Sequence, residues 1–186
     1  HGHRHARKVA IAAIGTSMCA ALVHEQPIEA DGLIAWPYVT DSRRLTYSFG
    51  GGATAGAVVK WFRDTFAQLE KQEEQAGGVN AYRALDEAAE RISCGSDGLV
   101  VLPYFMGERS PLWDTDARGV IFGLSLAHTR AHVYRAFLEA VAYSLRHTIE
   151  AFNTDLGDTV LLAGGVTKSR LWRRVFAVVA GCSVVW

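Results

Sequence analysis

The chain has 186 residues, of which 49% are hydrophobic and 20% charged, a composition typical of one globular domain rather than of a disordered chain. Nineteen basic residues balance nineteen acidic ones, so the net charge of zero provides no overall field that would hold nucleic acid or an anionic membrane. No apolar run approaches the roughly 20 residues that a membrane helix needs, and no signal peptide is visible.

The three cysteines, Cys19, Cys94 and Cys182, are far apart and have no CxxC spacing, which predicts neither a zinc site nor a disulfide framework. Reduced cytosol suits this pattern best, so we expect a cytoplasmic protein. Both ends look truncated, because a strand begins almost directly after Lys8 and a second apolar run stops with the chain. Residues 1–7, with three histidines, are expected to be a tag remnant or a disordered terminus.

Residues 9–14 and 18–23 are short apolar runs on either side of a small polar turn, which predicts a β-hairpin. The turn contains Gly15, Thr16 and Ser17, whose backbone and hydroxyl groups could form a small nest of donors for a phosphate. A plain turn that merely tolerates small residues would have the same sequence.

Two further short strands are expected within residues 31–49, and one helix over residues 54–75. The apolar residues that repeat at helical spacing, and so are expected to form its packed face, are Val58, Trp61, Phe62, Phe66 and Leu69.

The segment before this helix also matches the dinucleotide-binding pattern GxGxxA at Gly50, Gly52 and Ala55. That pattern requires a buried parallel strand before it and an acid at the end of the next strand. Residues 46–48 are too polar for such a strand, and the nearest acids lie within the helix. A dinucleotide-dependent oxidoreductase is therefore the least favoured interpretation.

The middle of the chain predicts a helix over residues 81–91, capped by Asn80, and a buried strand over residues 98–105. A long polar loop, residues 106–119, follows and leads to a short strand over residues 120–124. Loops of this length are often functional. We nevertheless favour a structural role for the charged residues of this loop, as ion pairs and turn caps that hold it in place. These residues are Glu108, Arg109, Asp114, Asp116 and Arg118.

The longest helix is expected over residues 131–152, with Thr129 as its N-cap. Glu139 lies on or near the packed side, where it would either anchor a loop by a hydrogen bond or sit at a partly wet edge. The histidines of this region share no ligand spacing with a carboxylate, so no metal site is predicted.

The last stretch, residues 159–181, begins with apolar residues that predict a buried strand, passes Gly164 and Gly165, and then becomes helical. Backbone can approach a ligand closely at such a turn, and the N–H groups of the first helical turn favour an anion or a polar group. The same glycines would equally serve a plain bend between strand and helix.

Strands come first and helices then alternate with strands, an order that predicts an α/β fold with a mixed sheet and helices on both faces. Three turns of small residues, at Gly15, at residues 50–56 and at residues 164–165, could converge on one edge of such a sheet. Three such turns in one place would make a nucleotide site.

Five blocks of the sequence resemble the FGGY carbohydrate kinases, a family that includes xylulokinase and glycerol kinase. The blocks follow in order, cover nearly the whole chain, and are most specific over residues 102–123. They are GTS at 15–17, GGATAGAVVKWFRD at 51–64, GSDGLVVLPYFMGERSPLWDTDARGVIFGL at 95–124, HTRAHVYRAFLEAVAYSLR at 128–146 and AGGVTKSRLWRRVFA at 163–177.

The resemblance implies an actin-like, ribonuclease H-like ATPase domain over residues 1–186, the C-terminal nucleotide-binding domain of a two-domain sugar kinase. Such kinases transfer the γ-phosphoryl group of MgATP to a sugar or polyol hydroxyl, so ATP and Mg²⁺ are the implied cofactors. The missing first domain would bind most of the sugar, and the apolar surface expected where it docks could also support homo-oligomers. No nucleic-acid or membrane partner is implied.

The resemblance also assigns nucleotide contacts to particular residues. Thr16 would face the ATP phosphates in a turn shaped by Gly15 and Ser17. Gly56 would let the nucleotide approach, with Lys60 beside it, a position where glycerol kinases often have glutamine. The implied nucleotide-binding residues are Gly15, Thr16, Ser17, Gly56, Lys60, Gly164, Gly165 and Ser169, the last of which tends to be asparagine in glycerol kinases.

Two features of the family are absent from the sequence. Its members have an Asp-Gly phosphate hairpin in the first domain, and a catalytic aspartate, the general base for the sugar hydroxyl, shortly before the GTS turn. Here the first acid is Glu25. We therefore expect no catalytic residue in these 186 residues, weak binding of adenine nucleotide and no sugar kinase activity by the chain alone. An actin-like ATP-binding module that acts through a partner is the alternative.

Overall fold

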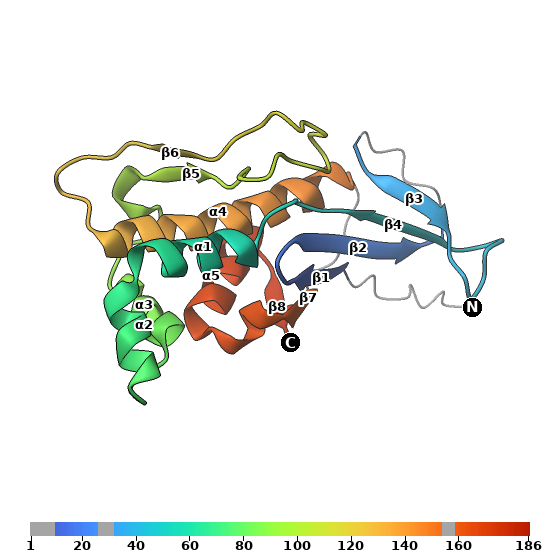
Figure 1. Cartoon of the computed structure of the whole chain (residues 1–186). Helices are drawn as coiled ribbons and strands as arrows, with labels where there is room; N and C mark the ends of the chain where they lie inside the picture. Colours follow the sequence, from blue (N-terminus) through green and yellow to red (C-terminus); the bar gives the residue numbers. More distant parts are fainter. Residues whose placement is uncertain (1–9, 26–31, 154–158) are drawn as a thin grey trace.

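The first two strands form the hairpin that the sequence predicts. In the computed structural model, which describes residues 10–25, 32–153 and 159–186, strand β1 (Ala10–Ile14) pairs antiparallel with β2 (Met18–His24) (Figure 1). Alternate residues of β1 are buried, as expected of a strand with one face on the core. The predicted tag or terminus at residues 1–7 lies outside the described residues.

The hairpin is the centre of a six-stranded sheet with the order β3-β4-β2-β1-β7-β8. β1 is parallel to β7, and β7 to β8, whereas the other neighbours are antiparallel, so the predicted mixed sheet is confirmed. The remaining strands of this sheet are β3 (Ile34–Pro37), β4 (Thr46–Gly50), β7 (Thr159–Gly164) and β8 (Ser183–Val185).

Helices α4 (Arg130–Ala151) and α5 (Arg170–Ala180) pack against each other and cover the sheet face that carries Ala12 (Figure 1). The chain moves in the same direction across the sheet from β1 to β7 and from β7 to β8, which are parallel neighbours. Right-handed crossovers therefore place α4 and α5 on one face. On the opposite face Ile11 is 45% exposed. Within the described residues the predicted helical cover is thus present on one face of the sheet.

Helix α4 is the core element of the domain. Nine consecutive residues, from Tyr134 to Ala142, are buried, which is the pattern of a helix covered on all sides. The large sheet and α5 lie on one side of α4, and a second, two-stranded sheet lies on another (Figure 1). That small sheet pairs β5 (Val100–Leu102) with β6 (Val120–Phe122).

The prediction of a buried strand over residues 98–105 is wrong in extent and in burial. Only Val100–Leu102 form a strand, and within it Val101 alone is buried, whereas Val100 is 53% and Leu102 40% exposed. The reason is that the two-stranded ladder covers α4 with one face and leaves its other face open. The predicted strand that follows the loop is present, but ends at Phe122.

The predicted single helix over residues 54–75 is two helices, α1 (Gly56–Phe66) and α2 (Gln68–Gln75). They are separated by Ala67, which is fully buried and has non-helical dihedral angles (φ −121°, ψ 46°). Gln68 Nε2 donates to the carbonyl of Thr65 (2.7 Å) at this break. As a result α2 has no buried residue, and Leu69 is exposed rather than part of the packed face.

Both predicted helix caps are confirmed. Asn80 begins α3 (Ala81–Ala89) and its Oδ1 accepts hydrogen bonds from the N–H groups of Tyr82 (3.1 Å) and Arg83 (3.3 Å). Thr129 begins α4, where its N–H donates to Nδ1 of His132 (3.0 Å) in a capping box.

Glu139 on α4 anchors a loop, the first of the two roles considered for it. Its carboxylate accepts from the N–H of Gly95 (3.1 Å), the hydroxyl of Ser96 (2.9 Å) and Nε of Arg135 (2.7 Å). Glu139 and Arg135 are 4% and 6% exposed, so this is a buried ion pair with additional hydrogen bonds.

Replacing Glu139 by alanine is expected to lower the free energy of unfolding by about 3–5 kcal/mol, because Arg135 would remain buried without a counter-charge. Glu150→Ala is the matched control on the same helix: Glu150 pairs with Arg146 at the same spacing, but both are exposed. We expect a loss below about 1 kcal/mol there. Urea denaturation measures both variants, and equal losses would contradict a structural role for the buried pair.

Candidate functional site

The three predicted turns do converge, and they meet backbone to backbone around Gly15. The N–H of Gly56 donates to the carbonyl of Gly15 (2.8 Å), and the N–H groups of Ala55 and Ala57 donate to the carbonyl of Thr16 (2.9 and 3.1 Å). On the other side, Gly164 at the end of β7 pairs in register with Ile14 at the end of β1. The start of α1 and the carboxyl ends of two parallel strands therefore meet at one point, where ligands of α/β folds commonly bind.

Two glycines permit this approach. A Cβ atom on Gly56 would lie 2.4 Å from the carbonyl oxygen of Gly15. A Cβ on Gly164 would lie 2.2 Å from the carbonyl oxygen of Ile14, and its φ of +100° is one that other residues rarely adopt. In contrast, a Cβ on Gly165 would meet no atom within 4 Å. Gly56 and Gly164 are thus needed for packing, whereas Gly165 is open to a ligand.

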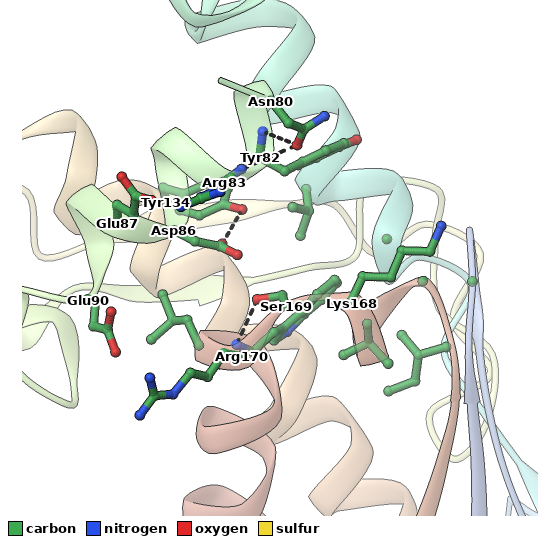
Figure 2. A pocket seen from close by; sticks show the side chains of 18 residues that line it. Asn80, Tyr82, Arg83, Asp86, Glu87, Glu90, Tyr134, Lys168, Ser169 and Arg170 are labelled. Atoms are coloured by element: carbon green, nitrogen blue, oxygen red, sulfur yellow. Dashed lines mark hydrogen bonds and ion pairs between the residues drawn. The ribbon is translucent and has the colours of Figure 1, made fainter. Parts of the chain in front are cut away.

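A cavity of about 890 Å³ opens beside these turns, between α3, α5 and the turn that follows β7 (Figure 2). Its walls include buried apolar and aromatic side chains, and charged residues of α3 and α5 surround its opening. Its volume is that of a typical small-molecule site. The residues that form these walls are Val59, Tyr134, Val166, Leu171 and Trp172.

A smaller cavity of about 420 Å³ adjoins the larger one, since Gly15, Gly56 and Tyr82 line both. The smaller cavity has a hydroxyl, that of Thr16, and an ammonium group, that of Lys60, among its lining residues. The smaller cavity thus offers two donors suited to an anion, although the Asp64 carboxylate also lines it.

The structure brings together six of the eight predicted nucleotide-binding residues and leaves two outside. Ser17 and Gly164 line neither cavity. The carbonyl of Ser17 accepts from the N–H of Gly15 (2.9 Å), so Ser17 shapes the turn. The residues that do line the cavities are Gly15, Thr16, Gly56, Lys60, Gly165 and Ser169.

The two glycines at the end of β7 do not open a helix directly, as the sequence suggested. They lead into a 3₁₀ turn, Gly165–Lys168, and α5 begins only at Arg170. Ser169 is the N-cap of α5, and its hydroxyl accepts from the N–H of Trp172 (3.0 Å). The N-terminal N–H groups of α5 therefore lie beyond the glycines, and Gly165 contributes access to the cavity rather than a helix dipole.

The Lys60 ammonium forms an ion pair within its own helix. Its Nζ lies 2.6 Å from Oδ2 of Asp64, one turn further along α1. Hydrogen bonds from Lys60, Arg63 and Lys71 hold the pKa of Asp64 far below its usual range. A ligand in the smaller cavity would compete with this carboxylate for the exposed Lys60 ammonium.

Asp86 and Tyr134, which the sequence reading did not single out, also line the larger cavity. The hydroxyl of Tyr134 donates to Oδ1 of Asp86 (3.0 Å). Burial raises the pKa of Asp86, although hydrogen bonds from Ser169 and Tyr134 act in the opposite direction. Residues 83, 86, 87 and 90 share one face of α3, but exposed helices commonly carry such a polar stripe, so this signal alone could not have marked a site.

The charged residues of the loop at 106–119 act mainly as caps, in agreement with the favoured interpretation. Oε1 of Glu108 accepts from the N–H groups of Ala53 (2.8 Å) and Arg109 (2.7 Å), and Nη2 of Arg109 donates to the carbonyl of Gly52 (3.0 Å). Oδ1 of Asp114 accepts from two N–H groups of its own turn. The loop thereby holds the segment that enters α1.

The dinucleotide pattern at Gly50, Gly52 and Ala55 lacks its structural context. The strand that precedes it, β4, is antiparallel to both of its neighbours. The first acid that follows it, Asp64, lies on α1, and the acidic cluster of Glu70, Glu73 and Glu74 lies on α2. A Rossmann site is therefore excluded at this position.

The fold has counterparts among solved structures. Xylulose kinase from Lactobacillus acidophilus superposes with a TM-score of 0.81 at 26% identity, covering 95% of this chain and 34% of that one. The domain is thus an α/β domain with the actin-like, ribonuclease H-like ATPase fold. Residues 10–186 match the C-terminal domain of the FGGY family of carbohydrate kinases, and the chain belongs to this family.

Characterised relatives agree with this assignment. Gluconokinase from Bacillus subtilis is 35% identical over 178 residues, which are 92% of this chain and 34% of the relative. Xylulose kinase from the same organism is 34% identical over 142 residues, 75% of this chain and 26% of the relative. The chain thus spans about a third of the length of gluconokinase. None of the helices in the described part of the chain has the length and apolarity needed to span a bilayer.

The two adjacent glycines at the end of β7 are expected to respond oppositely to alanine. Gly164→Ala should lower the free energy of unfolding by at least about 1–3 kcal/mol, the cost of its backbone conformation alone. Gly165→Ala should leave it unchanged or raise it by up to about 1 kcal/mol, because the new methyl group enters open space. Thermal or urea unfolding compares the two, and a stable Gly164→Ala protein would contradict the packing role.

Proposed function

We propose that these residues are the ATP-binding half of a carbohydrate kinase, which transfers the γ-phosphoryl group of MgATP to a sugar or polyol hydroxyl. The support is the cavity at the junction of Gly15, Gly56 and Gly165, in a chain that belongs to the FGGY family. The chain would be the C-terminal nucleotide-binding domain of a two-domain enzyme.

The two adjacent cavities suit the two ends of a nucleotide. The larger one, with apolar walls, fits a nucleoside, and the smaller one offers Thr16 and Lys60 to the phosphates. Gly165 leaves room for the nucleotide between the turn and α5, and Ser169 lies beside it. Mg²⁺ would enter with the phosphates, since no group of three acids, histidines or cysteines within residues 10–25, 32–153 and 159–186 is arranged to hold a metal.

The sugar or polyol would be bound together with a first domain that supplies the general base. Relatives named gluconokinase, xylulose kinase and glycerol kinase support this substrate class. The three free cysteines suit the reducing cytoplasm that we propose as the location. Apolar side chains such as Phe122, 71% exposed, suit docking of a further domain or a second copy.

Thr16→Val is expected to weaken MgADP binding about tenfold, because it removes one hydroxyl hydrogen bond to a charged phosphate while it keeps the β-branched shape. Ser17→Ala is the matched control, since it removes the neighbouring hydroxyl, which lines neither cavity. Isothermal titration calorimetry gives both affinities. Unchanged binding by Thr16→Val, or an equal loss in both variants, would contradict the assigned phosphate contact.

The 186-residue chain by itself is expected to show no sugar-dependent ATP turnover, because no acid precedes Glu25 to act as the general base. A coupled assay for ADP release, with gluconate, xylulose or glycerol as acceptor, measures this directly. A full-length relative assayed in parallel is the positive control. ADP release that depends on an added sugar would contradict the expectation.

A further inference from the structure

We propose that Asp86 is the residue that selects the nucleobase, with its carboxylate accepting a hydrogen bond from the exocyclic amino group of adenine. The inference deepens the proposed function and rests on it, because it concerns the nucleoside end of the same cavity.

The Asp86 carboxylate lies between two hydroxyl groups and is held by one of them. Figure 2 shows its carboxylate between Tyr134 and Ser169, at the side of the cavity formed by α3. The Tyr134 hydroxyl, on a side chain that is 2% exposed, donates to Oδ1 of Asp86 (3.0 Å). The Ser169 hydroxyl lies close to this carboxylate and acts to lower its pKa. Asp86 is thus a positioned acceptor and not a mobile surface acid.

Asp86 has no ion pair within the described part of the chain. The two neighbouring acids on α3 do have one each: Glu87 pairs with Arg83 (2.9 Å), and Glu90 with Arg174 (2.8 Å). An ionised carboxylate can accept about four hydrogen bonds, and the two hydroxyls leave capacity for another donor. A phosphate would be repelled from this position, whereas a neutral N–H group would be bound.

The surroundings of Asp86 favour a base over a ribose. Buried apolar groups of Val59, Leu171 and Trp172 line the same cavity and suit a flat ring. The predicted phosphate contact, Thr16, lines the other cavity, and Figure 2 shows the Lys168 ammonium on the side away from Asp86. With the phosphates at that side, the base would reach Asp86. Adenine presents an amino donor there, whereas guanine and hypoxanthine present a carbonyl oxygen.

The test compares the affinities of the chain for ADP, inosine diphosphate and 2′-deoxy-ADP by calorimetric titration. Inosine diphosphate differs from ADP at this position by a carbonyl oxygen in place of the amino group. We expect ADP to bind at least about tenfold more tightly than inosine diphosphate. With inosine diphosphate, the Asp86 carboxylate would lose the amino donor and would face a carbonyl oxygen that repels it. 2′-Deoxy-ADP should bind like ADP.

Asp86→Asn turns the acceptor into a group that also donates. The amide oxygen can still accept from the hydroxyls of Tyr134 and Ser169. Its NH₂ group then faces the base and can donate to the carbonyl of hypoxanthine. The preference for ADP should therefore vanish or reverse in this variant. Glu73→Gln on α2 is the control, where an exposed acid that lines neither cavity is changed in the same way and the preference should persist.

Each other outcome contradicts the inference in a distinct way. Equal binding of ADP and inosine diphosphate by the unmodified chain, or an unchanged preference in Asp86→Asn, would overturn base selection by Asp86 and leave the proposed function intact. A loss confined to 2′-deoxy-ADP would move the contact to the ribose and also overturn it. Failure of the folded chain to bind any of the three nucleotides would refute the proposed function itself, and base selection with it.

Discussion

The close contact of three backbone segments around Gly15 is the constraint on which the site depends. The carbonyl of Gly15 accepts from Gly56 at 2.8 Å, a distance possible only because Gly56 has no Cβ. On the other side, Gly164 lies against the backbone of Ile14 for the same reason. Glycine therefore lets α1 and the end of β7 reach the same turn. The cavities form around that junction, and larger residues at either place would separate their walls.

A second layer of contacts holds this junction in place. Residues 103–109 form hydrogen bonds with the segment that enters α1. Glu108 accepts from the N–H of Ala53, and Arg109 donates to the carbonyl of Gly52. The hydroxyl of Thr54 donates to the carbonyl of Pro103. These residues directly follow β5, a strand of the small sheet that covers α4. The loop that resembles the family most specifically thus supports the site instead of lining it.

Local signals in the sequence were sufficient for much of the fold. The polar turn between two apolar runs marked the hairpin, and Asn80 and Thr129 marked the starts of α3 and α4, because capping and turn chemistry depend on neighbours in the chain. The sequence did not reveal the break at Ala67. Its helical periodicity continues to Leu69, but burial of Ala67 in the core requires dihedral angles that end the helix.

For the site, the sequence by itself determined the family, the three glycine turns and six of the residues that line the cavities. Only the tertiary structure separated Gly164, whose contact with Ile14 is backbone packing, from Gly165, which faces open space. It also revealed Asp86, whose importance depends on a hydrogen bond to Tyr134 on a different helix. The physical reason is that such contacts join residues about 50 or more positions apart, and no local pattern of residue types encodes which of them will meet.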